Sequence, residues 1–296
     1  MSLWQIYLRP HTLAEAMQAL TSAPQPALPI AGGTDLLLDL RQGRHTPVHT
    51  LVDLTEVTEM TAIELRDDAL YIGAAVPVSR IARDPLVGAH AQALAEAANL
   101  IAGPQVRNVA TLGGNVAHAL PAADGTIALT ALNAQVSVAG LEAVRRLPLT
   151  ELFLGPGQSA LRPGELIVGF HLPLCRPGQA STFQRVMRAQ GIALPILNLA
   201  VWLERQANRM TDIHLAVGPS APTPRRLEAT EFVLRGQEFS EALLETALET
   251  LLHEAHFRSS PHRATADYRR RVVAVLLRAA LTNAWNRAGK SLEFNL

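Results

Sequence analysis

The sequence of 296 residues has little of several residue types, and each shortage excludes a class of structure. Cys175 is the only cysteine, so the chain can form no intrachain disulfide and cannot hold an iron–sulfur cluster, which needs about four thiolates. No uninterrupted apolar run approaches the roughly 20 residues that span a bilayer, and no basic segment leads a long apolar run at the N-terminus. We therefore expect a protein of the reducing cytoplasm, with neither a membrane span nor a signal peptide.

Neither sign of charge is in excess. The 26 acidic and 26 basic residues cancel, which gives no reason to expect nucleic acid or an anionic membrane as a partner. Lys290 is the only lysine, and we interpret the resulting dominance of arginine as a compositional bias and not as a functional feature. The chain is 48% hydrophobic and 18% charged, which predicts a substantial core, and its length allows two domains.

Segments of helix and strand character follow one another without a regular repeat. Thr12 and Glu15 form a capping box, which signals a helix start, and the last two helices are expected to begin near Ser240 and Thr265. Strands come in pairs and helices come in pairs, which predicts an α+β fold and argues against a doubly wound dinucleotide fold. The other expected helices are residues 35–42, 90–100 and 124–132, and the expected strands are 50–54, 62–65, 70–73, 136–138, 165–172, 198–204 and 211–217.

Two diglycine segments, residues 31–35 (Ala-Gly-Gly-Thr-Asp) and 111–115 (Thr-Leu-Gly-Gly-Asn), are the most informative feature of the chain. Successive glycines let the backbone turn tightly and expose its N–H groups to a closely bound anion. Either segment alone is explained as well by an ordinary turn in which glycine supplies a positive φ. Two of them, about eighty residues apart, favour one large phosphate-bearing ligand held from both sides, and a dinucleotide with a central pyrophosphate fits.

Polar side chains beside the glycines support this interpretation. Thr34 follows the first pair, and Thr111 and Asn115 flank the second, so each loop carries hydroxyl or amide donors that suit phosphate oxygens. Asp35 does not suit a phosphate directly. We expect it at the N-terminus of a helix, where a carboxylate is favourable, or bonded to nearby N–H groups.

Other motifs are weak. Residues 155–160 imitate the G-x-G-x-x-A nucleotide fingerprint, but Pro156 and Pro163 make a following helix unfavourable, so we expect an ordinary loop. His253 and His256, with His262 nearby, lack the spacing of a zinc protease, and we expect solvated histidines on a helix face and no metal site.

No side-chain group marks a catalytic centre. Cys175 has no base beside it in the sequence, so we expect a structural or incidental thiol. The arginines at 269–271 open a helix, and we expect a solvated or partner-facing surface there. The chain has no nucleophile elbow and no P-loop, so we assign no catalytic residue.

Residues 31–36, followed by 105–115 and 121–124, resemble the FAD-binding subunit of the molybdenum hydroxylases, a family that includes the medium subunits of carbon monoxide dehydrogenase and xanthine dehydrogenase. The resemblance covers nearly the whole chain. Further similar segments are residues 7–16, 165–173, 221–227 and 268–270.

The resemblance implies an α+β fold: an FAD-binding domain of the vanillyl-alcohol-oxidase type with two subdomains, followed by a smaller α+β C-terminal domain. We expect the FAD-binding domain at residues 1–175, with subdomains of about 1–55 and 56–175, and the C-terminal domain at 176–296. The boundary coincides with the proline- and glycine-rich residues 173–178.

The resemblance also implies FAD as the cofactor and assigns residues to it. The two glycine loops would hold the pyrophosphate, and the acidic residue after the second loop would contact the ribityl or ribose region. Other positions match contacts near the flavin, including Arg185, where the family often has a lysine; arginine keeps the charge but not the geometry. The residues assigned to the cofactor are Ala31, Gly32, Gly33, Thr34, Asp35, Ile101, Ala110, Thr111, Gly113, Gly114, Asn115, Asp124, Val168 and Arg185.

The function implied is that of an electron-transfer flavoprotein subunit. A molybdopterin-containing large subunit would oxidise the substrate, and a [2Fe-2S] small subunit would pass electrons to FAD, which would deliver them to NAD, oxygen or a quinone. The single cysteine fits this division, because the clusters must then lie on another chain. The alternatives are a self-contained flavin oxidase and a non-catalytic assembly protein of the same fold that binds no redox cofactor.

Overall fold

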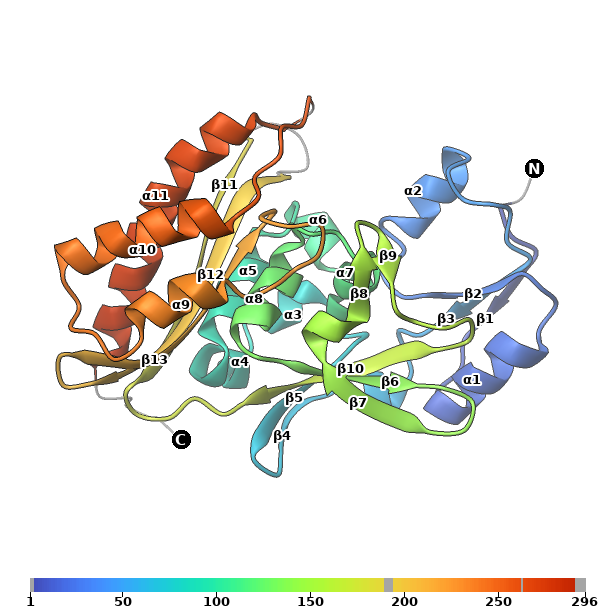
Figure 1. The fold of residues 1–296 in the computed structure, drawn as a ribbon. Coiled ribbons are helices and arrows are strands. Elements are labelled where there is room, and N and C mark those ends of the chain that lie inside the picture. The colour runs from blue at the N-terminus through green and yellow to red at the C-terminus, as the bar shows by residue number, and fades with distance from the viewer. Residues whose placement is uncertain (1–2, 189–193, 262, 291–296) are drawn as a thin grey trace.

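The computed structural model describes residues 3–188, 194–261 and 263–290, and it arranges them around three main β-sheets (Figure 1). The N-terminal sheet is parallel, with strand order β1-β3-β2. It is formed by β1 (Ile6–Leu8), β2 (Ala27–Ile30) and β3 (Thr50–Asp53), and is accompanied by α1 (Leu13–Ser22) and α2 (Leu36–Arg41). The capping box expected at Thr12 is confirmed, because its hydroxyl accepts from Glu15 N at 3.2 Å and the Glu15 carboxylate accepts from the Thr12 amide.

The second sheet has five antiparallel strands in the order β4-β5-β10-β6-β7. Its strands are β4 (Ile63–Arg66), β5 (Ala69–Gly73), β6 (Gln135–Ala139), β7 (Val144–Pro148) and β10 (Leu166–Pro173). The chain between β5 and β6 contains α3 (Val78–Ile81), α4 (Pro85–His90), α5 (Gln92–Leu100), α6 (Pro104–Arg107), α7 (Leu112–Ala117) and α8 (Asp124–Ala131). The short elements are η1 (Thr58–Met60), η2 (Leu149–Leu152), β8 (Phe153–Gly155) and β9 (Gln158–Ser159).

Expectations for this part are largely confirmed. The hairpin expected around residues 66–68 is β4–β5, with Asp67 at a φ of +52° in its turn. The helix expected over residues 90–100 begins later, because Ala91 leaves helical geometry and separates α4 from α5. Residues 155–160 form no phosphate loop: β8 and β9 pair as a short hairpin, with Gly157 at a φ of +72° in its turn.

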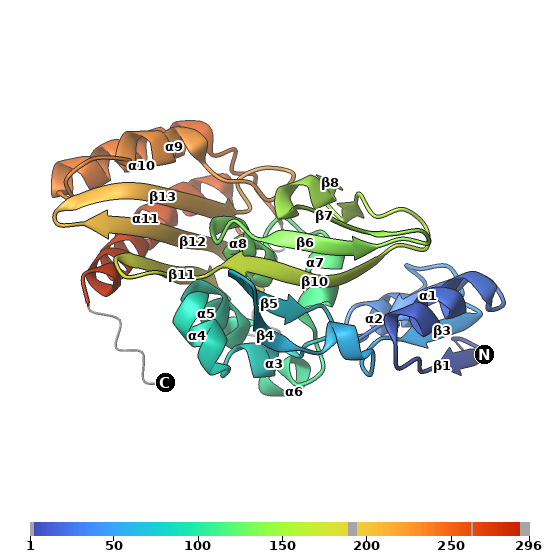
Figure 2. The ribbon, with the colours of Figure 1, turned by 90° about the horizontal axis from the view of Figure 1, so that it is seen from below.

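The third sheet is antiparallel, β11-β12-β13, and both of its faces are covered (Figure 2). It consists of β11 (Gln179–Met187), β12 (Pro195–Gln206) and β13 (Arg209–Gly218), followed by α9 (Glu228–Leu234), α10 (Glu241–Glu254) and α11 (Ala266–Ala288). Leu197, Leu199 and Val201 join the core with α9–α11, whereas Ala200 on the opposite face joins the core of the second sheet and its helices. This alternation follows the two-residue period of a strand. The helix starts expected at Ser240 and Thr265 are confirmed, since both residues cap their helices.

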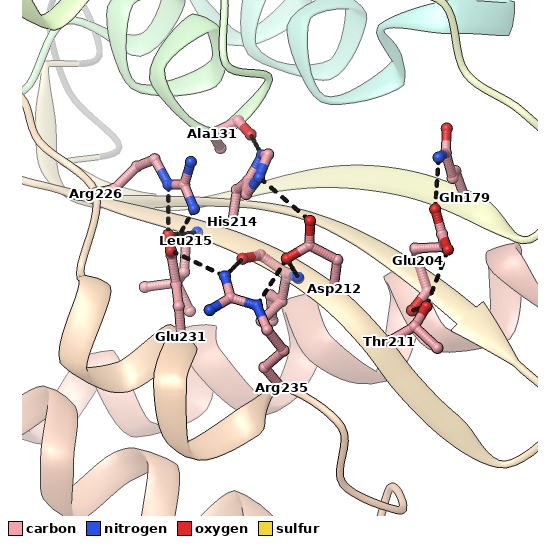
Figure 3. A network of polar contacts seen from close by, with 11 residues as sticks. Ala131, Gln179, Glu204, Thr211, Asp212, His214, Leu215, Arg226, Glu231 and Arg235 are labelled. Carbon is pink, nitrogen blue, oxygen red and sulfur yellow. Dashed lines mark hydrogen bonds and ion pairs between the residues drawn. The ribbon is translucent and has the colours of Figure 1, made fainter.

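Helices α5 and α8, which lie between β5 and β6 in the sequence, pack against the third sheet and so connect it to the part of the chain that carries the second sheet. A polar network on β13 and α9 adds to this junction (Figure 3). The Glu231 side chain, almost fully buried, pairs with Arg226 and accepts from Leu215 N at 2.7 Å. His214 Nδ1 lies 3.2 Å from the carbonyl oxygen of Ala131, the last residue of α8. The third sheet, which we also call the C-terminal sheet, therefore contacts the C-terminal end of α8.

The expectation that the arginines at 269–271 form a solvated or partner-facing surface is wrong for Arg269. Arg270 and Arg271 are exposed, as expected, but Arg269 is only 1% exposed. Its guanidinium donates to the carbonyl oxygen of Ile196 at 3.0 Å and to that of Arg258, so its charge is satisfied by backbone acceptors. Arg269 thus fastens the segment before α11 to the start of β12.

None of the helices among the described residues combines the length and the apolar character needed to cross a bilayer.

Candidate functional site

The two glycine loops touch through their backbones. A β-carbon on Gly32 would lie 2.2 Å from the carbonyl oxygen of Val109 and 2.7 Å from the Cα atom of Ala110, so the two segments approach more closely than any side chain permits. Val109 and Ala110 immediately precede the second diglycine segment. The structure therefore brings together two motifs that lie about eighty residues apart in the sequence.

The first loop connects β2 to α2. Gly33 has a φ of +65°, a conformation that glycine adopts without strain. Ala31, Gly32, Gly33 and Thr34 are all half-buried, which leaves part of the loop accessible. Asp35 stands at the N-cap position of α2, as expected, although its side chain makes no capping bond.

The Asp35 carboxylate instead faces the second motif. Its Oδ2 atom lies 3.3 Å from Nδ1 of His118, the residue that ends α7. This contact lowers the pKa of Asp35, and the same contact raises the pKa of His118. Both side chains are substantially exposed, so solvent screens the pair. The ion pair forms a second link between the two loops.

The second loop leads into α7, and its two glycines serve different purposes. Thr111 caps the helix, since its hydroxyl accepts from Gly114 N at 3.1 Å. A β-carbon on Gly113 would lie 2.6 Å from the β-carbon of Ala74, so Gly113 is required for packing against the end of β5. Gly114 is exposed, and a β-carbon there would meet only the Thr111 hydroxyl, at 3.2 Å. The open side of the loop is thus at Gly114.

Asn115 connects the second loop to α8. Its Oδ1 atom is buried without a hydrogen-bond partner, and a β-carbon on Gly125 would lie only 2.7 Å from it. A buried amide oxygen without a partner is uncommon in a folded protein and suggests a missing donor. The Asn115 side chain therefore lies against the first turn of α8, close to the acidic residue that follows the loop.

Asp124 and Arg185, expected near the cofactor, form a buried ion pair. Their side chains are 5% and 2% exposed. The Asp124 carboxylate also accepts from Nδ2 of Asn198, at 2.7 Å. Burial raises the pKa of Asp124, while the charge of Arg185 and the bond from Asn198 act in the opposite direction by stabilising the carboxylate. Arg185 and Asn198 lie on β11 and β12, so the third sheet reaches the start of α8.

The remaining expected positions surround the same loops. The carbonyl oxygen of Val168, at the bulge of β10, accepts from Ala74 N at 2.9 Å, which places Val168 beside the residue that Gly113 packs on. Ile101 ends α5 at the start of the segment that leads to Ala110, and its carbonyl oxygen accepts from Arg107 at 3.0 Å.

Sequence reasoning missed His118 and Asn198. His118 lies three residues beyond Asn115, at the C-cap of α7, and this helical spacing was the only local sign that it shares a face with the second motif. Asn198 is fully buried inside an apolar strand, Ile196 to Val201, where a single amide stands out from its neighbours. That contrast is a usable signal, because a buried polar side chain needs a specific partner.

Other candidate groups lie apart from the loops. Burial raises the pKa of the Cys175 thiol to about 11, so the thiol stays protonated and unreactive at neutral pH. His253 is exposed on α10, as expected; His256 is exposed too but lies beyond the end of that helix, and His262 lies outside the described residues. Two cavities, of about 510 and 440 Å³, lie between α10 and α11 and beside α8 and η2, and none of the expected cofactor residues lines either one.

Comparisons with known families cover both halves of the chain. Residues 2–175 match the family described as FAD binding domain in molybdopterin dehydrogenase. Residues 181–284 match the family described as CO dehydrogenase flavoprotein C-terminal domain.

Similar proteins extend over nearly the full length. A putative xanthine dehydrogenase FAD-binding subunit of Escherichia coli K12 is 31% identical over 97% of this chain and 98% of its own length. The carbon monoxide dehydrogenase medium chain of Hydrogenophaga pseudoflava is 29% identical over 95% and 97%. A solved structure of carbon monoxide dehydrogenase from Hydrogenophaga pseudoflava, in a form that lacks the Mo-pyranopterin moiety, matches with a TM-score of 0.89 at 28% identity, over 96% of this chain and 98% of that one.

Proposed function

The chain belongs to the family of FAD-binding medium subunits of the molybdenum hydroxylases, and we propose that it passes electrons from an iron–sulfur partner through bound FAD to an external acceptor. FAD is its cofactor, and the chain is the flavoprotein component of an oxidoreductase. The single observation that carries the proposal is the backbone contact at Gly32, which brings the two glycine loops together so that one ligand can touch both.

The residues of the two loops fit a diphosphate. Gly114 is open to solvent and offers no β-carbon that would keep an anion away from the backbone. The unpartnered oxygen of Asn115 is an acceptor that a ribityl or ribose hydroxyl would satisfy. The residues that we propose as cofactor contacts are Ala31, Gly32, Gly33, Thr34, Asp35, Ile101, Ala110, Thr111, Gly113, Gly114, Asn115, Asp124, Val168 and Arg185.

We propose that these residues hold and orient FAD and take no chemical part in the reaction. The first loop would bind the pyrophosphate by backbone N–H groups, the second would let it approach closely at Gly114, and Asp124 would accept from a hydroxyl of the ribityl or ribose region. Bound FAD supplies the redox chemistry, while the protein sets its position and its surroundings. No side-chain acid, base or nucleophile is needed for this role.

The proposed partners are a molybdopterin-containing large subunit, which would oxidise the substrate, and a [2Fe-2S] small subunit. The names of the similar proteins support an assembly of several subunits, since two of them are a medium chain and an FAD-binding subunit. Cys175 is the only thiol, so a cluster in the assembly belongs to another chain. The same shortage of cysteine supports a cytoplasmic location.

We also propose that residues 1–175 form the FAD-binding domain, with subdomains of about 1–55 and 56–175, and that residues 176–296 form the C-terminal domain. The sheets support these boundaries. Strand β3 ends at Asp53 and β4 begins at Ile63, while β10 ends at Pro173 and β11 begins at Gln179.

The direct test is the absorption spectrum of the full chain produced alone and incubated with FAD. After removal of free FAD, the protein should show the flavin band in near-equal molar ratio. A folded chain that remains colourless after this treatment contradicts the proposal and favours an assembly protein without a redox cofactor.

The Asp35–His118 pair predicts a pH dependence of FAD release. Because its pKa is raised, His118 stabilises the folded loops below its ordinary value of 6.5, and this stabilisation is lost as pH rises through the folded pKa. Because its pKa is lowered, Asp35 stabilises the folded loops above its ordinary value of 3.8, and this stabilisation is lost as pH falls through the folded pKa. Because the pair links the two glycine loops, release, followed by flavin fluorescence, should be slowest between these two values. It should accelerate both as pH rises through the folded pKa of His118 and as pH falls through that of Asp35, by no more than about fivefold because the pair is exposed.

The matched variant is His118→Gln, which keeps a polar side chain but cannot titrate. It should release FAD at a rate that no longer rises across neutral pH. An unchanged pH profile in His118→Gln would show that another group controls release.

A further inference from the structure

We propose that Asn198, on β12 of the C-terminal sheet, is a positioning residue that holds the Asp124 carboxylate toward the cofactor, so that the C-terminal domain determines how tightly FAD is retained. This inference deepens the proposed function and rests on it. Asn198 lies 74 residues from Asp124 in the sequence, is fully buried and lies on a strand of the third sheet, whereas Asp124 is the first residue of α8. Nothing in the family resemblance assigned it to the cofactor site.

The hydrogen bonds of Asn198 fix the orientation of its amide. Its Nδ2 group donates to the carbonyl oxygen of Ala122 at 3.0 Å and to Oδ1 of Asp124 at 2.7 Å. Both partners are acceptors, so only the NH₂ group of the amide can face them. The remaining oxygen of Asn198 is buried, without a hydrogen-bond partner, on the other side of the amide. The position therefore requires a neutral double donor, which asparagine supplies and aspartate does not.

These two bonds hold the approach to α8. Ala122 precedes Asp124 in the turn between the second glycine loop and the helix, and Asp124 is the first residue of α8. The side chain of Asn115, on α7, packs against Gly125 in the first turn of α8. Asn198 thus holds the first residue of α8, and the next residue, Gly125, packs against Asn115 of the second glycine loop.

The charges around Asp124 stabilise its ionised form against the opposing effect of burial, which raises the pKa of this carboxyl. Arg185 on β11 pairs with the carboxylate, and Arg263, in the segment before α11, acts on it through its positive charge. Asn198 on β12 adds a neutral donor. Each carboxylate oxygen accepts more than one hydrogen bond, so one donor on each oxygen leaves capacity for a hydroxyl of the cofactor.

Polar contacts connect both ends of α8 to the C-terminal sheet, and the contact at the far end provides a control. Asn198 contacts the start of α8, and His214 contacts the carbonyl oxygen of Ala131 at its end. If Asn198 only fastened the sheet to the helix, loss of either contact would have a similar effect on FAD. If Asn198 positions Asp124, only the contact at the start of α8 affects FAD affinity.

The test uses the full-length chain and measures the FAD dissociation constant by fluorescence titration at pH 6 and pH 8, with circular dichroism and thermal melting as a check of folding. Asn198→Asp places a second carboxylate beside Asp124. At pH 8 the two charges repel, and affinity should fall about tenfold, the loss expected when a charge-assisted hydrogen bond is removed. At pH 6 a shared proton restores a donor, so affinity should recover in part. His214→Ala should melt at a lower temperature with FAD affinity unchanged.

The exchange variant Asp124→Asn with Asn198→Asp separates positioning from fastening, and it decides the question if Asn198→Asp alone fails to fold. It keeps one carboxylate and one amide at the contact but moves the charge to residue 198. We expect its thermal stability to recover while its FAD affinity stays low. Full recovery of FAD affinity in the exchange variant, wild-type affinity in Asn198→Asp, or an equal loss in His214→Ala would overturn the inference. Failure of the wild-type chain to bind FAD would instead contradict the proposed function.

Discussion

Gly32→Ala should destroy the cofactor site and destabilise the chain. The new β-carbon would lie 2.2 Å from the carbonyl oxygen of Val109, a backbone atom that cannot rotate away, so the two glycine loops must separate. We expect the free energy of unfolding to fall by about 1–3 kcal/mol, the usual cost of overpacking. Loss of the bonds from one loop, taken as two charge-assisted hydrogen bonds of about 1.5 kcal/mol each, should weaken FAD binding about a hundredfold.

The matched control for this substitution is Gly88→Ala. Gly88 lies within α4, and a β-carbon there would come no closer than 4.0 Å to any neighbour, the Gln92 side chain. Alanine is preferred over glycine in a helix by about 1 kcal/mol, so the control should be as stable as the wild type or more so, with unchanged FAD affinity. Urea denaturation and fluorescence titration of both variants provide the measurement. Normal FAD affinity in Gly32→Ala would show that the contact between the loops is not needed for binding.

Gly114→Val should leave the fold intact and abolish FAD binding. Gly114 is exposed, and a β-carbon there would meet only the Thr111 hydroxyl, at 3.2 Å. The loop therefore accommodates a valine side chain, but this side chain occupies the space through which a diphosphate would approach the backbone. We expect loss of the flavin band, with at least about a hundredfold weaker binding, because the added side chain holds the diphosphate away from its donors in the first loop.

Two comparisons make this result specific. Gly88→Val introduces the same side chain into a helix away from the loops and should retain FAD. Gly113→Ala should behave differently from Gly114→Val, because its β-carbon would lie 2.6 Å from that of Ala74 and would disturb the fold itself. A Gly114→Val chain that keeps its flavin band would remove Gly114 from the cofactor site.

Signals carried by neighbouring residues were sufficient to predict several elements. The helix starts at Thr12, Ser240 and Thr265 each depend on one hydroxyl and an amide three residues later, so the sequence contains the whole interaction. The hairpin β4–β5 likewise depends on its own turn and flanking strands. The two glycine loops were found for the same reason, since glycine itself is the requirement.

Strand β11 was missed because its pattern is not apolar. Ser181 and Thr182 lie in it and are nearly fully buried. Their hydroxyls are satisfied by α5: Ala93 N donates to Ser181 Oγ at 3.0 Å, and Thr182 donates to Glu96 at 3.0 Å. These partners lie 86 and 88 residues away in the sequence, so no local window contains the reason for burying the two side chains.

The same limit applies to the site. The positions of the glycine loops were predicted, but their meeting at Gly32 depends on a tertiary contact with Val109. The resemblance brought Asp124 and Arg185 into one list of contacts, whereas their direct pairing and their shared partner Asn198 depend on how β11 and β12 pack on α8. Local chemistry identified the parts of the site, and the packing of the sheets determines which parts touch.

A crystal structure of the chain with FAD, alone or in its complex, tests the central claim most directly. The account predicts that a single pyrophosphate contacts both loops, accepting hydrogen bonds from main-chain N–H groups of residues 32–34 and lying against Gly114 of the second loop. A pyrophosphate in contact with only one of these loops, or bound elsewhere on the chain, would contradict it.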